Sequence, residues 1–142
     1  MSYDLKIING DLSIGGNGDI VKITDSDKLI QDILKILTTP LGTNKFFPSY
    51  GSPLTKTLIG TTYDFNFIGP MASNQIDSSL NLLKQLQQLQ MSSGQSVSPL
   101  ELISAVQQTK VERNQTDPRF FRVFVRVLNR ALTTASTAFD VG

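Results

Sequence analysis

The sequence predicts an α+β fold in which about three helices pack on a small mixed or antiparallel sheet. Short apolar stretches separated by glycine-rich turns in residues 3–23 indicate an N-terminal meander of strands. Apolar residues recur at helical spacing between residues 24 and 91. The pattern then changes to strict alternation at residues 120–128, which is typical of a strand with one buried face.

Length and composition favour one domain that spans residues 1–142. Only 18% of the residues are charged, and a weakly charged surface suits burial in an assembly. The chain has no cysteine and no histidine, so it lacks thiolate ligands and the commonest general base. We therefore expect no metal site, no cofactor and no enzymatic activity. No apolar run approaches the ~20 residues of a membrane span, and we expect no membrane partner.

The first predicted helix follows the meander. Thr24 or Asp25 is the expected N-cap, and Asp27 adds favourable charge to the first turn. Its apolar stripe consists of Leu29, Ile30, Ile33, Leu34 and Leu37. Pro40 and Gly42 end it. The loop that follows, residues 38–56, holds three of the six prolines and three aromatic residues, so we expect it to be pinned to the core or to a partner.

Two more helices are predicted after an ambiguous stretch at residues 57–69. One runs from about Pro70 to Met91, with its apolar stripe at Ile76, Leu80, Leu83, Leu86 or Gln87, and Leu89. The other begins at a capping box, in which Ser98 is the cap, Pro99 the first helical residue and Glu101 the third. Its expected core residues are Leu102, Ile103 and Val106.

The C-terminal strand has two unlike faces. Alternation assigns one face to the core, with Phe121, Val123, Val125 and Val127. The other face mixes long cations with apolar groups, which suits an interface or a cover over the sheet: Phe120, Arg122, Phe124, Arg126, Leu128 and Arg130. The tail at residues 131–142 is expected to return as a second strand or to lie extended as an arm.

Charge concentrates in the last part of the chain. Residues 113–142 carry five arginines against two aspartates, a net charge of +3, whereas the first 112 residues carry eight lysines against ten acids. Arginine favours bidentate contacts at interfaces, so this region reads as a contact surface. A small nucleic-acid-binding module, with Arg122 and Arg126 on phosphates and Phe124 stacked on a base, is the alternative. The overall charge of only +1 argues against it, and we expect no nucleic-acid partner.

Glycoside hydrolysis needs two carboxylates about 5–9.5 Å apart. The chain has only two glutamates, Glu101 and Glu112. On one helix they would lie about 16 Å apart along the axis, which is too far for either mechanism. The acids and glycines of residues 10–19 lack the spacing of a phosphate-binding loop or an EF-hand, and we interpret them as turns.

Asp117-Pro118-Arg119 stands at the entry to the C-terminal strand. Proline fixes its own φ and favours an extended residue before it, which suits a strand entry. An exposed pair of Asp117 and Arg119 would contribute less than about 1 kcal/mol. On these residues alone, we interpret the triplet as the entry to a strand with an exposed ion pair.

Motifs in a fixed order over roughly residues 10–130 indicate more: Gly18-Asp19-Ile20, Gln31-Asp32-Ile33, Leu37-Thr38-Thr39-Pro40-Leu41-Gly42, Phe47-Pro48-Ser49-Tyr50-Gly51-Ser52-Pro53-Leu54 and the triplet. In this order and spacing the chain resembles the baseplate-wedge and sheath-initiator proteins of contractile phage tails and of related injection systems. The hallmark of that family is Glu-Pro-Arg, so Asp117 replaces a glutamate. Thr43 stands where a glutamate often follows the glycine of the first loop. Part of the family carries a lysozyme label, against which the carboxylate argument speaks here.

The resemblance implies a structural role in the virion, at the tail baseplate, after assembly in the host cytoplasm. It implies that Asp117, Pro118 and Arg119 dock on baseplate wedge proteins. It implies that the C-terminal strands offer an edge on which the tail sheath protein assembles by β-augmentation. Tail tube or hub proteins are further expected partners, and six copies per ring are expected. Arg122, Phe124 and Arg126 belong to the expected protein interface.

Overall fold

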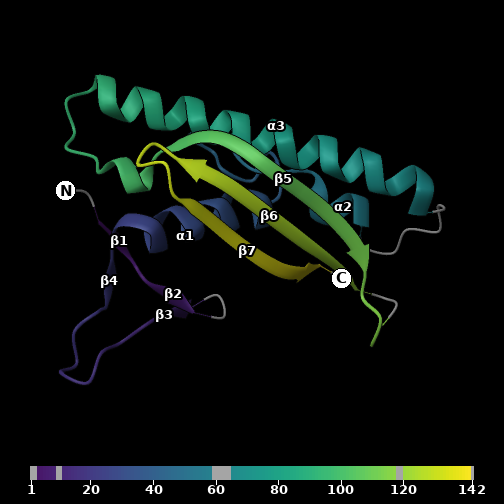
Figure 1. The fold of residues 1–142 in the computed structure, drawn as a ribbon. Coiled ribbons are helices and arrows are strands. Elements are labelled where there is room, and N and C mark those ends of the chain that lie inside the picture. Colours follow the sequence, from purple (N-terminus) through teal and green to yellow (C-terminus); the bar gives the residue numbers. More distant parts are fainter. Residues whose placement is uncertain (1–2, 9–10, 59–64, 118–119, 142) are drawn as a thin grey trace.

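The computed structural model describes residues 3–8, 11–58, 65–117 and 120–141. In these residues the chain forms three α-helices, a short 3₁₀-helix and seven strands (Figure 1). The α+β class predicted from the sequence is confirmed. In chain order the elements are β1 (Asp4–Leu5), β2 (Ile7–Ile8), β3 (Asp11–Leu12), β4 (Lys22–Ile23), α1 (Asp25–Thr38), α2 (Leu54–Leu58), α3 (Phe65–Ser92), η1 (Pro99–Glu101), β5 (Ile103–Arg113), β6 (Phe121–Asn129) and β7 (Thr134–Val141).

The main sheet has three antiparallel strands in the order β5-β6-β7, so β6 lies in the middle. Its alternation places Phe121, Val123, Val125 and Val127 in the core, as predicted. The helices cover that face, with α3 packed on β5 and α1 reaching β7 (Figure 1). The core that results holds apolar residues of both helices, among them Leu29, Ile33, Ile36, Leu37, Ile68, Ile76, Leu80 and Leu83. The opposite face of the sheet remains uncovered by any described helix.

The prediction of a third helix is wrong beyond the first turn, after which the chain forms a strand. Ser98 does act as a cap, since its Oγ accepts a hydrogen bond of 3.3 Å from the Leu100 N–H, but the turn it starts is the three-residue η1. Strand β5 follows at once. Glu101 is buried in this turn, and Ile103 packs in the core as the first residue of a strand.

The second predicted helix begins earlier than expected. Helix α3 starts at Phe65, and Pro70 lies inside it instead of at its first turn. Burial of Ile68 accounts for the extension, because it packs in the core. Leu89 is exposed, and at the preceding turn of the helix Gln87, not Leu86, takes the buried position.

The N-terminal meander consists of two small antiparallel pairs, β1 with β4 and β2 with β3. Side chains of α1 tie it to the body. Gln31 accepts a hydrogen bond of 2.9 Å from the Ile7 N–H and donates one of 2.8 Å to the Leu5 carbonyl. The same amide donates to Asp4, which also forms an ion pair with Lys35.

The loop between α1 and α2 closes on itself at Gly51. The Ser52 N–H donates to the Thr39 carbonyl at 2.9 Å, and Gly51 has a φ of 115°. A Cβ on Gly51 would lie 2.6 Å from that same carbonyl oxygen, so only glycine fits. Tyr50 packs against the core as expected of a pinned loop, whereas Phe46 is 99% exposed.

Candidate functional site

The uncovered face of the sheet brings together three of the predicted interface residues. Arg122, Phe124 and Arg126 project from alternate positions of β6. Arg122 lies across the ladder from Glu112 on β5 and from Asp140 on β7, and its Nε is 3.7 Å from the Asp140 carboxylate. Both side chains are largely exposed, so this pair contributes less than about 1 kcal/mol.

Arg126 has no such neighbours. Its partners across the ladder are Gln108 and Ser136, which are both neutral. Its guanidinium lies 5.7 Å from the centroid of the Phe124 ring, within the range of a cation–π contact. Within the described ranges, no carboxylate lies at ion-pair distance from Arg126.

A depression of about 340 Å³ lies beside these residues, between β5 and β7 across β6. Its lining combines both signs of charge with an aromatic ring: Gln108, Lys110, Glu112, Arg122, Phe124 and Ala138. Lys110 and Glu112 form an ion pair within it. Mixed charge of this kind favours a protein surface over a polyanion as the partner.

The triplet that the resemblance gives as a docking point lies in the connection between β5 and β6. Pro118 and Arg119 fall outside the described residues, so only Asp117 is placed. Asn114 closes this connection: its Oδ1 accepts hydrogen bonds from the Thr116 and Asp117 N–H groups at 2.8 and 3.2 Å. The Asn114 N–H donates to the Phe120 carbonyl at 2.9 Å, which ends the turn at the start of β6.

The outer edge of β7 is the clearest candidate surface. Within the described part of the chain, no strand pairs with it. The Asn129 N–H donates to the Thr133 carbonyl at 3.0 Å, which fixes the alternation of hydrogen-bonded pairs along β6 and β7. The backbone N–H and C=O groups that point to the open edge are therefore those of Thr134, Ser136, Ala138 and Asp140.

This edge lacks the features that usually protect one. Natural edges are blocked by bulges, prolines and lysines. Strand β7 pairs with β6 in unbroken register over eight residues, and it contains neither proline nor lysine. Just before it, Leu132 is 78% exposed and has a φ of 64°, a conformation that a leucine rarely adopts.

The opposite edge, β5, is protected in three ways. Two bulges, at Ser104 and Gln107, interrupt its pairing with β6. The Lys84 ammonium donates a hydrogen bond of 2.9 Å to the Ser104 carbonyl, so that this bulge is also capped. Three of the last four residues of the strand are charged: Lys110, Glu112 and Arg113. The two edges of one sheet thus differ in their capacity to accept another strand.

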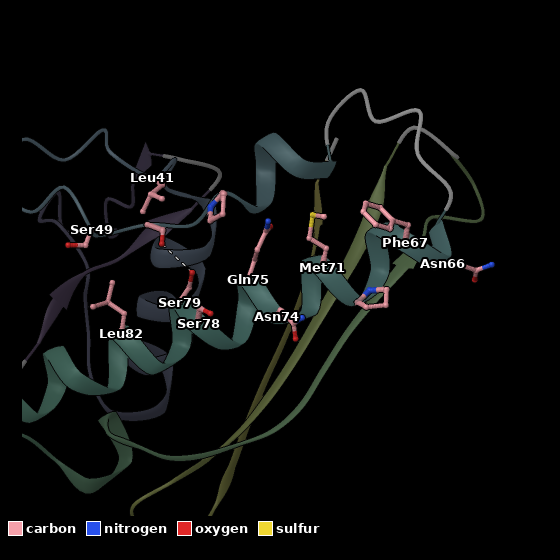
Figure 2. Close-up of a pocket in the computed structure, with 13 residues that line it drawn as sticks. Leu41, Ser49, Asn66, Phe67, Met71, Asn74, Gln75, Ser78, Ser79 and Leu82 are labelled. Atoms are coloured by element: carbon pink, nitrogen blue, oxygen red, sulfur yellow. Dashed lines mark hydrogen bonds between the residues drawn. The ribbon is translucent and has the colours of Figure 1, made fainter.

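Sequence reasoning missed a groove along α3 (Figure 2). It has a volume of about 720 Å³ and lies between the helix and the loop before α2. Its apolar lining is Leu41, Pro53, Phe67, Pro70, Met71 and Leu82, and none of its thirteen lining residues is charged. The Ser79 hydroxyl donates to the Gly51 carbonyl at 3.2 Å and so joins the two walls. The helical spacing of Phe67, Met71 and Leu82 was the signal that could have revealed it.

The shifted pKa values lie at the foot of the N-terminal meander. Burial raises the pKa of Asp32, and the ion pair with Lys28 offsets this only in part. Burial also acts on Asp4, but hydrogen bonds from Lys35, the Leu5 N–H and Gln31 outweigh it, and the pKa of Asp4 is lowered. Burial, followed by the charges of Asp32 and Asp4, raises the pKa of Tyr50.

Glu101 and Glu112 belong to different elements, η1 and β5, and do not share a helix. In the described residues, no three carboxylates come together in a way that could hold a metal ion. No helix there is long and apolar enough to cross a membrane. The sequence matches no protein-family model and no curated protein.

Proposed function

We propose that this protein is a non-catalytic structural component of a contractile tail baseplate, which docks on wedge proteins and starts the tail sheath by β-augmentation. The observation that carries the proposal is the open, regular edge of β7. An incoming strand finds a row of unpaired backbone groups from Thr134 to Asp140. The order of motifs along the chain supports the choice of a contractile tail as the assembly.

The binding free energy expected for one strand on this edge is small, which suits an assembly in which the contact is repeated around a ring. Each backbone hydrogen bond contributes about 0.5–1.5 kcal/mol net, so one added strand binds weakly. Six copies on one ring would hold a sheath layer together through multivalency, although each contact is weak. The exposed Leu132 lies at the start of the edge, where it adds an apolar contact for the incoming chain.

Docking and templating use different parts of the molecule. Asp117, Pro118 and Arg119 belong to the β5–β6 connection, whereas the open edge faces away from β5 on the far side of β6. A wedge protein bound at the triplet would lie near the end of β7, because Phe121 pairs with Val141, whereas the edge from Thr134 to Ala138 lies farther along the strand. The uncharged groove along α3 is a further surface for wedge, tube or hub proteins.

The sharpest test replaces one backbone donor of the edge. Ser136→Pro removes the N–H that points outward and leaves the hydrogen bonds to β6 in place, since edge strands tolerate proline. We expect tails with baseplates but without an ordered first sheath ring. Ser136→Ala keeps the N–H and serves as the control. Full-length sheaths on Ser136→Pro particles, with the variant folded by circular dichroism, would contradict the proposal.

Docking is tested separately with Arg119→Ala, for which we expect baseplates that lack this protein. Contractile particles of normal composition would exclude the docking role of the triplet. The nucleic-acid alternative predicts binding that weakens with salt and is lost in Arg122→Ala or Arg126→Ala. A gel-shift assay at low salt separates it from our proposal, which expects no shifted band.

A further inference from the structure

The open edge of β7 is complementary to itself. An edge strand without protecting features pairs with whatever strand it meets, including a second copy of the same strand. Two β7 strands pair antiparallel across a twofold axis, so every contact occurs twice. Backbone hydrogen bonds require that outward-pointing residues lie opposite one another, here Thr134, Ser136, Ala138 and Asp140.

That requirement leaves two registers with long overlap. In one, Ser136 faces Ala138 of the second copy, and in the other, Ala138 faces itself while Ser136 faces Asp140. Charge decides between them. In the second register the partner's Asp140 lies in line with Ser136 and, behind it, with Arg126 on β6. The first register places that carboxylate opposite Thr134, whose neighbour on β6 is the uncharged Leu128.

Of the two arginines on the uncovered face of β6, Arg126 is the one with no carboxylate opposite it on either neighbouring strand. Two strand spacings, about 10 Å, separate its Cα from the partner's Asp140 Cα. An extended arginine and an aspartate span that distance, and the small side chain of Ser136 leaves the path clear. Among the described residues, only Arg122 lies at ion-pair distance from the Asp140 carboxylate, in an exposed contact of 3.7 Å, so Asp140 can exchange partners.

We infer that the free protein forms a twofold dimer in which the β7 edges of two copies pair antiparallel about Ala138, with an Arg126–Asp140 bridge at each end. The six-stranded sheet that results hides the edge that starts the sheath. Dimer formation therefore competes with β-augmentation and protects the free subunit from uncontrolled strand addition. The inference goes beyond the proposed function and is measured on purified protein, so its failure would leave the sheath role intact.

The absence of cysteine from the chain makes a clean cross-linking test possible. Ala138→Cys places the two thiols opposite each other, at a separation that a disulfide can span. Ser136→Cys, on the same face, leaves its two copies about 14 Å apart along the strands. Under mild oxidation we expect a cross-linked dimer for Ala138→Cys and none for Ser136→Cys. Equal or preferential cross-linking of Ser136→Cys would overturn the register, and no cross-link for either variant would overturn the dimer.

Sedimentation over a concentration series gives the second readout. Arg126→Glu opposes the partner's Asp140 with a like charge, and we expect the dimer to dissociate at least tenfold more readily. Arg130→Glu makes the same charge change in the turn beyond the paired strands and is expected to leave the dissociation constant unchanged. A wild-type protein that stays monomeric at high micromolar concentration, or equal effects of the two variants, would overturn the inference.

Discussion

The side-chain carbonyl of Gln87 accepts a hydrogen bond of 2.8 Å from the backbone N–H of Ile103. The amide of Gln87 also donates one of 2.9 Å to the Glu101 carbonyl, so a buried side chain of α3 satisfies the backbone on both sides of the η1–β5 junction. Gln31 on α1 does the same for the N-terminal meander. Two helices thus fix two strand starts with the same chemistry.

Replacement of Gln87 is expected to destabilise the fold. Gln87→Leu leaves a buried N–H and a buried carbonyl without their partners, each at a cost of about 1–3 kcal/mol. We expect a loss of about 2–4 kcal/mol in the free energy of unfolding, measured by urea denaturation. Gln88→Leu, on the exposed side of the same turn, is the control and is expected to change it by less than about 0.5 kcal/mol.

Alanine substitutions at two glycines are expected to affect stability very differently. Gly51→Ala forces a Cβ to within 2.6 Å of the Thr39 carbonyl oxygen at a φ of 115°, and we expect a loss of more than about 2 kcal/mol. Gly16→Ala meets no atom within 4 Å and is expected to be close to neutral. Thermal unfolding of the two variants measures the contrast. An equal, small effect would contradict the observed path of the loop before α2.

Acid is expected to loosen the N-terminal meander through Asp4. Its pKa is lower in the folded protein, so its stabilisation is fully present above the unfolded pKa, near 3.8, and is lost as the pH falls through the folded value. Because the pair with Lys35 is partly exposed, the contribution is below about 1 kcal/mol. The raised pKa of Asp32 changes the free energy of unfolding with pH in the opposite direction. The pH dependence of wild-type stability therefore contains the contributions of both aspartates.

A variant isolates the contribution of Asp4. Asp4→Asn should be less stable than wild type at about pH 5, and the difference should be smaller at a pH well below 3.8, the unfolded pKa of the aspartate. Urea denaturation at both pH values measures the difference, and hydrogen exchange at the Ile7 amide reports the meander itself. A stability difference that persists unchanged at low pH would contradict the assignment.

Leu132 offers a stabilising change. Its φ of 64° costs a leucine roughly 1–2 kcal/mol, which glycine avoids. The greater freedom of glycine in the unfolded chain offsets about half of the gain. We therefore expect Leu132→Gly to raise the free energy of unfolding by about 0.5–1 kcal/mol, measured by chemical denaturation. In tails, the same variant should start sheaths less efficiently if Leu132 contacts the incoming strand.

Strand β6 could be predicted from sequence because it lies in the middle of the sheet and pairs without interruption on one side. Its core face at Val123 and Val125 follows the alternation. Strand β5 could not be predicted in the same way. Bulges at Ser104 and Gln107 interrupt the alternation of buried and exposed residues, and the N-cap at Ser98 is a signal typical of the start of a helix. The cap at Ser98 does start a helical turn, but pairing with β6 makes the residues after that turn a strand.

The candidate site likewise has a part that could be predicted from sequence and a part that could not. Arg122, Phe124 and Arg126 were found because they share one strand, where spacing alone places them on one face. The open edge depends on which strands become neighbours, and the groove along α3 depends on a loop that returns to the helix through Gly51. Both are long-range properties: helical spacing shows that Phe67, Met71 and Leu82 share one face of α3, but not that a loop returns to form the other wall of the groove.

The contrast between the two edges gives the sheet a polarity. Bulges at Ser104 and Gln107, with Lys84 on the first, protect the edge of β5, whereas the edge of β7 has no bulge, proline or lysine. On the function proposed above, strands would therefore be added in one direction only. Within a ring, a subunit of this kind would set the order in which strands are added and would keep a second layer from forming on the wrong side.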